Sequence, residues 1–219
     1  MSTDRDLYLA DIGLPIWVLR QQQVLDPTAD KNNKKLWSQL ATAVDQCTLC
    51  SLHKNRTQTV FGVGRRDADL LIIGEAPGAE EDRKGEPFVG RAGQLLDAML
   101  AAVGFVRDDV YIANILKCRP PNNRDPRTEE ATACTPYLEQ QLSLIQPKVI
   151  LALGRIAAQW LLQCDTPIGR LRGNVDQFGA QEIPLIVSYH PAYLLRSPLA
   201  KAKSWEDLIL VKQTLRKEK

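Results

Sequence analysis

Four short apolar runs rich in β-branched residues alternate along this chain with stretches of helical periodicity. Runs of this kind are typical of strands that a parallel sheet buries on both faces. The strand runs lie at 69–73, 110–114, 148–153 and 184–188, and the helical stretches at 93–103, 128–145 and 155–163. The alternation predicts an α/β fold of three layers, α/β/α, with a central four-stranded parallel sheet.

Four cysteines form a second constraint on the fold. Cys47 and Cys50 make a C-x-x-C pair, and Cys118 and Cys134 follow far downstream, so together they would close one domain as a clasp. Four thiolates suit either zinc or a 4Fe–4S cluster, and the spacing alone leaves both open. The alternative is ordinary buried thiols, which is our interpretation of the fifth cysteine, Cys164.

Length and composition exclude several classes of protein. The chain has 219 residues, 44% of them hydrophobic and 25% charged, which suits a sizeable α/β domain with an appendage. It has neither a membrane-span pattern nor a secretory signal, so we expect a cytoplasmic protein with reduced thiols. The net charge is only +2, but 148–205 holds seven basic and three acidic residues, which favours a positive face there.

The first 35 residues differ from the remainder of the chain. An apolar stretch at 7–19 is followed by a polar segment at 21–35. We therefore predict an N-terminal recognition peptide with a flexible linker over 1–35, and one domain over 36–219.

Unusual polar residues follow three of the predicted strands. The turn 74–82 follows the first, Asn114 ends the second, and His190 follows the fourth. Each alone has a structural explanation, such as capping of a helix. Because ligands of open parallel sheets bind beyond the carboxyl ends of the strands, their convergence favours a shared functional site.

At these residues the chain becomes recognisable. The motifs GEAPG at 74–78, PFVGRAG at 87–93, NILKCRPP at 114–121 and HP at 190–191 occur together and in this order. Over 47–208 the chain resembles the family 4 uracil-DNA glycosylases. The resemblance implies a repair enzyme that rotates uracil out of single- or double-stranded DNA and hydrolyses its N-glycosidic bond, leaving an abasic site.

The same resemblance implies a 4Fe–4S cluster. Its ligands would be Cys47, Cys50, Cys118 and Cys134. We expect a structural cluster that ties the segment around Cys47 and the loop 118–134 onto the sheet.

The resemblance also implies a uracil pocket. The amide of Asn114 matches O4 and N3–H of uracil, whereas cytosine would leave buried groups unpaired at about 1–3 kcal/mol each. Phe88 is expected to stack on the base, which is worth roughly 1–3 kcal/mol. Thymine would be refused by Glu81 or by the backbone around Gly78, and the sequence leaves this open.

For the chemistry, we expect His190 to donate a hydrogen bond to O2 of the departing uracil. The turn formed by Glu75, Ala76 and Pro77 would add backbone donors. Glu75 and Glu81 are the carboxylates available to orient the attacking water. Family 1 relatives carry an aspartate at the position that resembles Ala76, so the sequence leaves the general base open.

Segment 190–197 resembles the loop that fills the gap left by a rotated base, with Leu194, Leu195 or Arg196 as the inserted residue. Asn123 is expected near the sugar or phosphate, unless it only forms a turn. Candidate phosphate contacts are Arg91, Arg119, Arg124, Arg170, Arg172 and Lys201. No inserted basic loop follows 81–85, so we expect turnover rather than covalent capture of DNA.

Residues 9–20 resemble the start of the psi subunit of the bacterial DNA polymerase III clamp-loader complex. This implies that Leu14, Trp17 and Leu19 bind the replicative clamp loader, whereas the alternative is a segment folded onto the catalytic domain. We expect a monomer. A second function stays open from the sequence, that of a non-catalytic iron–sulfur adaptor that holds DNA for replication partners.

Overall fold

Four parallel strands form the middle of the sheet, where the sequence predicted them. The computed structural model describes residues 27–218, and side chains from residue 33. The strands are β2 (Leu70–Gly74), β3 (Tyr111–Asn114), β4 (Val149–Leu153) and β6 (Ile183–Ser188). They pair in parallel in the order β3-β2-β4-β6. Every residue of β2, β3 and β4 is buried, as expected for strands covered on both faces.

Two antiparallel edge strands enlarge the sheet beyond the predicted four. β1 (Val63–Gly64) pairs with β3, and β5 (Val175–Phe178) pairs with β6. β1 is only two residues long, and the residues of β5 alternate between exposed and half-buried. Neither strand forms a continuous apolar run, so the pattern that identified the central strands did not apply to them.

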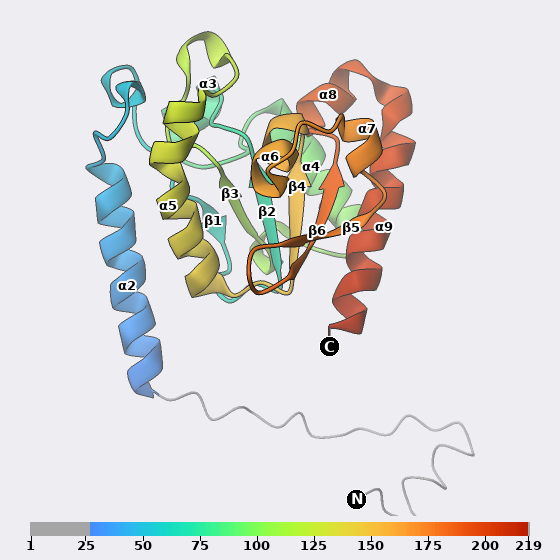
Figure 1. Ribbon diagram of the computed structural model, residues 1–219, viewed down its shortest axis with the longest axis horizontal. Coiled ribbons are helices and arrows are strands. Elements are labelled where there is room, and N and C mark those ends of the chain that lie inside the picture. The colour runs from blue at the N-terminus through green and yellow to red at the C-terminus, as the bar shows by residue number, and fades with distance from the viewer. Residues whose placement is uncertain (1–26, 219) are drawn as a thin grey trace, which may run out of the picture. The chain divides into compact units, whose positions relative to one another are not determined.

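Helices cover both faces of the sheet, which confirms the α/β fold (Figure 1). Their bounds are α2 (Pro27–Asp45), α3 (Ala79–Lys84), α4 (Arg91–Val103), α5 (Thr128–Ile145), α6 (Arg155–Leu162), α7 (Ile168–Leu171), α8 (Pro191–Arg196) and α9 (Lys201–Lys217). Short 3₁₀ turns lie at η1 (Ser51–Lys54), η2 (Arg107–Asp109), η3 (Pro121–Asn123) and η4 (Pro198–Ala200).

The residues of β2 alternate between two hydrophobic cores. Leu71 and Ile73 pack in the core that includes α5 and α6, and Leu70 and Ile72 pack in the core that includes α4 and α9. Figure 1 shows α5 and α6 on one side of the sheet and α4 and α9 behind it. The two cores fix the strands so that their carboxyl ends meet at one edge.

The chain divides into two units between Lys35 and Leu36. Helix α2 begins at Pro27, inside the segment that we predicted to be a flexible linker, and proline is favoured in the first turn of a helix. Leu14, Trp17 and Leu19 lie outside the described residues, so their docking on a clamp loader stays a prediction. Within residues 27–218, no helix has the length and apolar character needed to cross a bilayer.

Candidate active site

A cavity of about 450 Å³ opens at the carboxyl ends of the parallel strands. The lining residues that we had singled out from the sequence are Glu75, Ala76, Gly78, Glu81, Phe88, Asn114, Asn123, His190 and Arg196. The residues that complete the lining are Ala92, Asp125, Ala192 and Tyr193. Segments far apart in the sequence thus share one hollow of ligand-binding size, at the edge where open α/β sheets place their sites.

Asn114 lies in this cavity with an unsatisfied acceptor. The residue is 2% exposed, and its Oδ1 atom has no hydrogen-bond partner within the described part of the chain. A buried acceptor of this kind costs about 1–3 kcal/mol unless a ligand supplies a donor. The amide of Asn114 and the ring of Phe88 both lie against Gly74. A Cβ atom at this position would collide with Oδ1 of Asn114 and lie 2.7 Å from the ring. Glycine at the end of β2 therefore allows the amide and the ring to share one corner.

Glu81 holds the loop that carries Phe88. Its Oε1 atom accepts hydrogen bonds from the backbone N–H groups of Val89 and Gly90, each at 3.0 Å. Phe88 adopts a left-handed φ of 54°, and a Cβ at Gly93 would collide with its carbonyl oxygen. Oε1 of Glu81 thus positions the loop that carries the aromatic ring. Its predicted part in orienting water stays a prediction.

His190 caps helix α8 through its ring. Its Nδ1 atom accepts a hydrogen bond from the backbone N–H of Ala192 at 3.1 Å, so in the neutral ring the proton resides on Nε2. Burial lowers the pKa of His190 to about 4, against the opposing effect of the Glu81 carboxylate, and Arg196 lowers the pKa further. The imidazole is therefore a neutral Nε2–H donor at physiological pH. It lies nearly parallel to the ring of Phe88, with centroids 5.4 Å apart and planes at 29°.

Glu75 is the carboxyl group of the cavity with the most altered acidity. Burial and the nearby Asp125 carboxylate raise its pKa to about 7, and Arg155 acts in the opposite direction. Arg155 forms an ion pair with Asp125 at 2.8 Å. Asp125 was not among the residues predicted from the sequence. The only local signal was its place in the Pro- and Asn-rich loop 120–126, which follows one of the recognised motifs.

Two predicted phosphate contacts have structural partners instead. Arg172 binds the fully buried carboxylate of Asp207 at 2.8 Å, and Ser188 at the end of β6 donates to the same carboxylate at 2.8 Å. Arg124 binds both carboxylate oxygens of the buried Glu130, at 2.8 and 2.6 Å. These ion pairs fix the strand end before His190 and the start of α5, so both arginines are corrected to structural roles.

The predicted wedge is also corrected in part. Segment 191–196 is helix α8, and Leu194 is 0% exposed because it lies in the contact between α8 and α4. It is therefore unavailable to DNA in this conformation. Leu195 is 38% exposed, and Leu199 in the following turn η4 is 95% exposed. The exposed large hydrophobic side chains of α8 and η4 are thus Tyr193, which also lines the cavity, Leu195 and Leu199.

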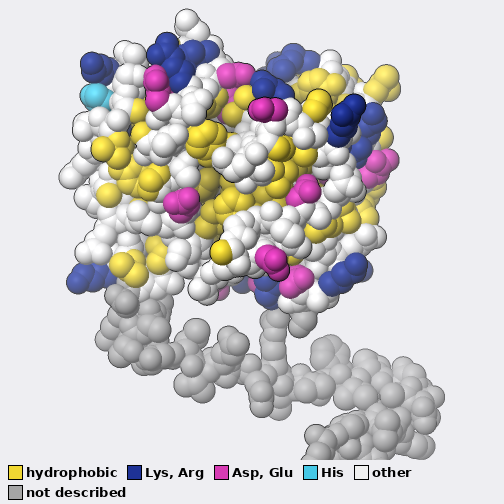
Figure 2. Space-filling view, viewed as in Figure 1, with side chains coloured by type: hydrophobic (Ala, Val, Ile, Leu, Met, Phe, Trp, Pro, Cys, Tyr) yellow, Lys and Arg dark blue, Asp and Glu magenta, His cyan; other side chains and the backbone are white. Residues whose placement is uncertain are grey.

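The other predicted contacts lie as follows. Arg91, Arg170, Arg196 and Lys201 are exposed, and Pro77 is buried outside the cavity lining. Arg119 is half-buried and its Nε atom donates to Oδ1 of Asn123 at 2.7 Å. Figure 2 shows Lys and Arg side chains gathered along the upper edge of the face in view, where Figure 1 places the strand ends. Asp and Glu side chains lie among them at the same edge.

The four predicted ligand cysteines line one small apolar pocket. Cys47 follows α2, Cys50 precedes η1, Cys118 follows β3 and Cys134 lies in α5. Arg56 donates to Sγ of Cys118 at 3.3 Å, and the N–H of Lys117 donates to Sγ of Cys134 at 3.2 Å. Within residues 27–218 as they stand, no three His, Cys, Asp or Glu side chains form a group that could hold a single metal ion.

The chemistry of this donor set nevertheless fits a metal group. Burial raises the pKa of the Cys134 thiol to about 11, so this site disfavours free thiolates. A bound metal group supplies the positive charge that keeps such sulfurs deprotonated. The N–H donors to Cys118 and Cys134 are of the kind that surrounds iron–sulfur clusters.

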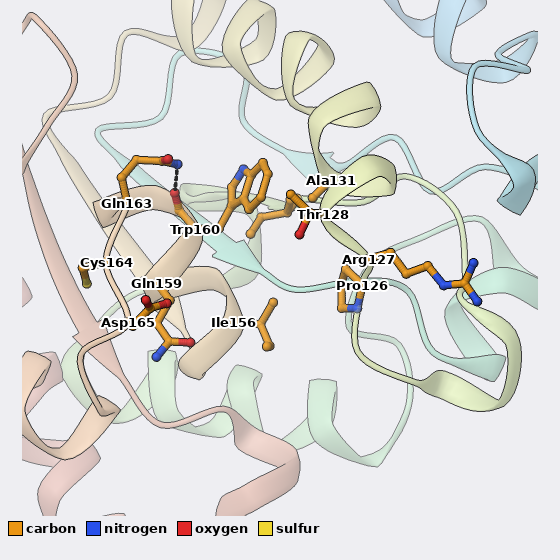
Figure 3. A pocket seen from close by; sticks show the side chains of 11 residues that line it. Pro126, Arg127, Thr128, Ala131, Ile156, Gln159, Trp160, Gln163, Cys164 and Asp165 are labelled. Carbon is orange, nitrogen blue, oxygen red and sulfur yellow. Dashed lines mark hydrogen bonds between the residues drawn. The ribbon is translucent and has the colours of Figure 1, made fainter.

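A separate cavity of about 320 Å³ lies between α5 and α6 (Figure 3). Trp160 and Ala131 line it together with Cys164, which is half-buried. In Figure 3 Gln163 lies at its edge and donates to the carbonyl of Trp160. None of the residues predicted from the strand ends lines this cavity, and Cys164 takes no part in the cysteine pocket.

Comparison with known proteins identifies the family of the chain. Residues 61–209 match the family model of the uracil DNA glycosylase superfamily. The chain is 48% identical over 168 residues to a type-4 uracil-DNA glycosylase of Archaeoglobus fulgidus, which covers 74% of this chain and 84% of that protein.

Two further relatives are type-4 uracil-DNA glycosylases of Thermotoga maritima and Pyrobaculum aerophilum. The first is 42% identical, covering 84% of this chain and 97% of that protein. The second is 43% identical, covering 76% and 88%. This chain belongs to the type-4 uracil-DNA glycosylases.

Proposed function

We propose that this protein rotates uracil out of DNA, hydrolyses the bond between uracil N1 and the sugar C1′, and leaves an abasic site. The observation that carries the proposal is the buried Oδ1 atom of Asn114, which lacks a partner among the described residues and lies in one cavity with Phe88 and His190. Membership of the type-4 family supports the same reaction.

Asn114 recognises the base by its hydrogen-bonding edge. Its Oδ1 accepts from N3–H of uracil, and its NH₂ group donates to O4. Cytosine presents a bare N3 and an amino group at these positions, so both contacts fail. Gly78 and Glu81 form one wall of the cavity, since a Cβ at Gly78 would lie 2.7 Å from Oε2 of Glu81. We assign the exclusion of the thymine methyl group to this wall.

Phe88 and His190 define the plane of the bound base. Their ring centroids are 5.4 Å apart and their planes lie at 29°, and both side chains line the same cavity. A base that stacks on Phe88 in this cavity would therefore lie beside the imidazole. The Nε2–H group can then donate to O2, where negative charge develops as the C1′–N1 bond breaks.

Glu75 is our candidate for the group that orients the water that adds to C1′. With a pKa raised to about 7 by burial and Asp125, its carboxylate form dominates only above neutral pH. Since the carboxylate is the active form, kcat should rise about tenfold per pH unit below pH 7 and level off above it. E75Q, which mimics the protonated acid, should show a flat profile at or below the rate that the wild type reaches near pH 5.

The D125N variant provides the control for this profile. It removes the negative charge that raises the pKa of Glu75, so the rising limb should move to lower pH. Single-turnover rates between pH 5 and 9 for the three proteins check the assignment. An unchanged limb in E75Q would assign the titration to another group.

Leu195 and Leu199 are our candidates for the side chains that fill the gap left by the rotated base. Both lie at the rim formed by α8 and η4, next to the cavity residues Tyr193 and Arg196. Rotation costs a few kcal/mol in a duplex and least in a single strand. Replacing both leucines by alanine should therefore reduce excision from duplex DNA about tenfold and leave single-stranded excision unchanged.

V106A is a matched control for the leucine variant. Val106 is 60% exposed but precedes β3, at the opposite end of the sheet from the cavity. It should not alter the ratio of duplex to single-stranded rates. An equal loss on both substrates in the double leucine variant would contradict a wedge function.

We also propose that Cys47, Cys50, Cys118 and Cys134 hold a 4Fe–4S cluster. The common pocket, the thiol donor set and the N–H donors to two sulfurs support it. A bound cluster would cross-link the segment around Cys47 to the segment 118–134. The hydrolysis described above uses only side chains of the cavity. Iron and sulfide analysis of the purified protein tests this assignment.

One assay tests the proposed reaction. The protein is incubated with an end-labelled oligonucleotide that contains a single uracil, and the DNA is then treated with alkali. Strand scission at the uracil position, with free uracil released, is the expected result. Tight binding with intact DNA would instead support the non-catalytic adaptor.

A further inference from the structure

Lys117 is a buried lysine that lies between the base pocket and the cysteine pocket. It is 1% exposed, and its ammonium group donates to the main-chain oxygen of Asn114 at 2.9 Å and to Oε1 of Gln141 at 2.6 Å. Gln141 donates in turn to the carbonyl of Phe61 and the hydroxyl of Tyr111. The ammonium of Lys117 thus has two hydrogen-bond acceptors. Both acceptors are neutral, so neither balances its positive charge.

A buried ammonium without a compensating negative charge is strongly disfavoured. Within residues 27–218, no ion pair joins Lys117 to a carboxylate, and the buried carboxylates have other partners. Asp82 accepts from the N–H of Thr57, Glu130 binds Arg124, and Asp207 binds Arg172. Within these residues, carboxylates therefore supply no partner charge to Lys117.

The cysteine pocket is the adjacent source of negative charge. The backbone N–H of Lys117 donates to Sγ of Cys134 at 3.2 Å, and Cys118 is the next residue in the chain. Four thiolates around a 4Fe–4S core leave the site with a net negative charge. The proximity of Lys117 to this site explains why a lysine can be retained in the core.

We propose that Lys117 is a positioning residue that supplies the positive counter-charge of the cluster and, through the carbonyl of Asn114, fixes the base-recognising amide relative to it. The inference rests on the proposed function and its cluster. The intervening backbone is held as well, since the N–H groups of Ile115 and Leu116 donate to the carbonyls of Gly74 and Glu75, each at 3.0 Å. Residues 114–118 thus form one fixed segment with the base pocket at one end and a cluster ligand at the other.

The test compares two charge variants. K117M keeps the length of the side chain and removes both its charge and its donors. It should lower the reduction potential of the cluster, because loss of a nearby positive charge favours the oxidised form, and should lower the preference for uracil over cytosine about tenfold. Q141E leaves Lys117 in place and puts a carboxylate beside its ammonium, so it should lower the potential while the base preference stays unchanged.

L138A is the control for general loosening of the core. Leu138 is 1% exposed and lies one helical turn after Cys134, and its truncation changes packing without changing charge. It should leave the reduction potential at the wild-type value. Potentials are measured by spectroscopic titration, and base preference by single-turnover rates on uracil- and cytosine-containing strands.

Each outcome decides the inference. A lowered potential in K117M and Q141E but not in L138A supports it. A wild-type potential in K117M, or an equal shift in L138A, overturns it while leaving the glycosylase assignment intact. Should K117M fail to fold, Q141E alone decides the question of charge. A wild-type protein without iron would contradict the proposed cluster itself.

Discussion

Replacing Asn114 by alanine is expected to lower kcat/KM for uracil excision by roughly 10²- to 10⁴-fold. The variant removes the acceptor for N3–H and the donor to O4, so two polar groups of the base would be buried unpaired at about 1–3 kcal/mol each. Each 1.4 kcal/mol corresponds to about a factor of ten in rate. The loss should be large because the cavity residue is 2% exposed, which leaves little room for water to replace the amide.

Binding of an abasic duplex separates recognition from folding in this variant. DNA with a tetrahydrofuran site has no base to contact Asn114, so N114A should bind it as tightly as the wild type does. Single-turnover excision and fluorescence anisotropy with the abasic duplex supply the two measurements. A parallel loss of abasic binding would indicate that Asn114 acts through the structure of the strand end rather than through uracil.

The centre of the fold could be predicted because its strands follow a simple physical pattern. Strands such as β2 and β4 are buried on both faces, so they must be apolar throughout, and the sequence shows this directly. β5 has only one protected side at the edge of the sheet, and its mixed sequence VDQF carries no such signal. Edge strands depend on pairing with an existing neighbour, which a local pattern does not report.

The site could be predicted only as far as the direction of each side chain could be inferred. Asn114 and His190 could be placed because strand ends of a parallel sheet meet at one edge, and the cavity contains both. Leu194 was assigned to DNA because its segment was interpreted as a loop. As helix α8, that segment turns Leu194 into the contact with α4 and leaves Leu195 exposed.

The roles of the carboxylates depend on contacts distant in sequence. Glu81 contacts Val89 and Gly90 across the turn before α4, and the Glu75 pKa responds to Asp125 fifty residues later in the chain. Sequence pattern identified both residues as polar groups at a strand end. Only the tertiary contacts distinguish the one that positions Phe88 from the one whose acidity suits an interaction with water.

The H190F variant should lose about 10²- to 10³-fold in kcat, with a smaller change in KM. Phenylalanine keeps an aromatic ring beside Phe88 but has no donor for O2 of the departing uracil, and one preorganised donor of this type typically contributes this much. Because burial lowers the pKa of His190 to about 4, the ring is neutral from pH 5 upward. The wild-type profile should therefore contain no limb from His190 between pH 5 and 9.

H190Q tests whether the lost function is hydrogen-bond donation. Its side-chain amide offers an N–H near the position of Nε2, so it should recover part of the rate that H190F loses. H190F removes the acceptor for the N–H of Ala192, whereas the amide oxygen of glutamine can still accept from it, so thermal stability should fall more in H190F. Single-turnover rates are therefore compared at a temperature at which both variants are folded, and equal rates would show that the imidazole does not stabilise the leaving uracil through a hydrogen bond.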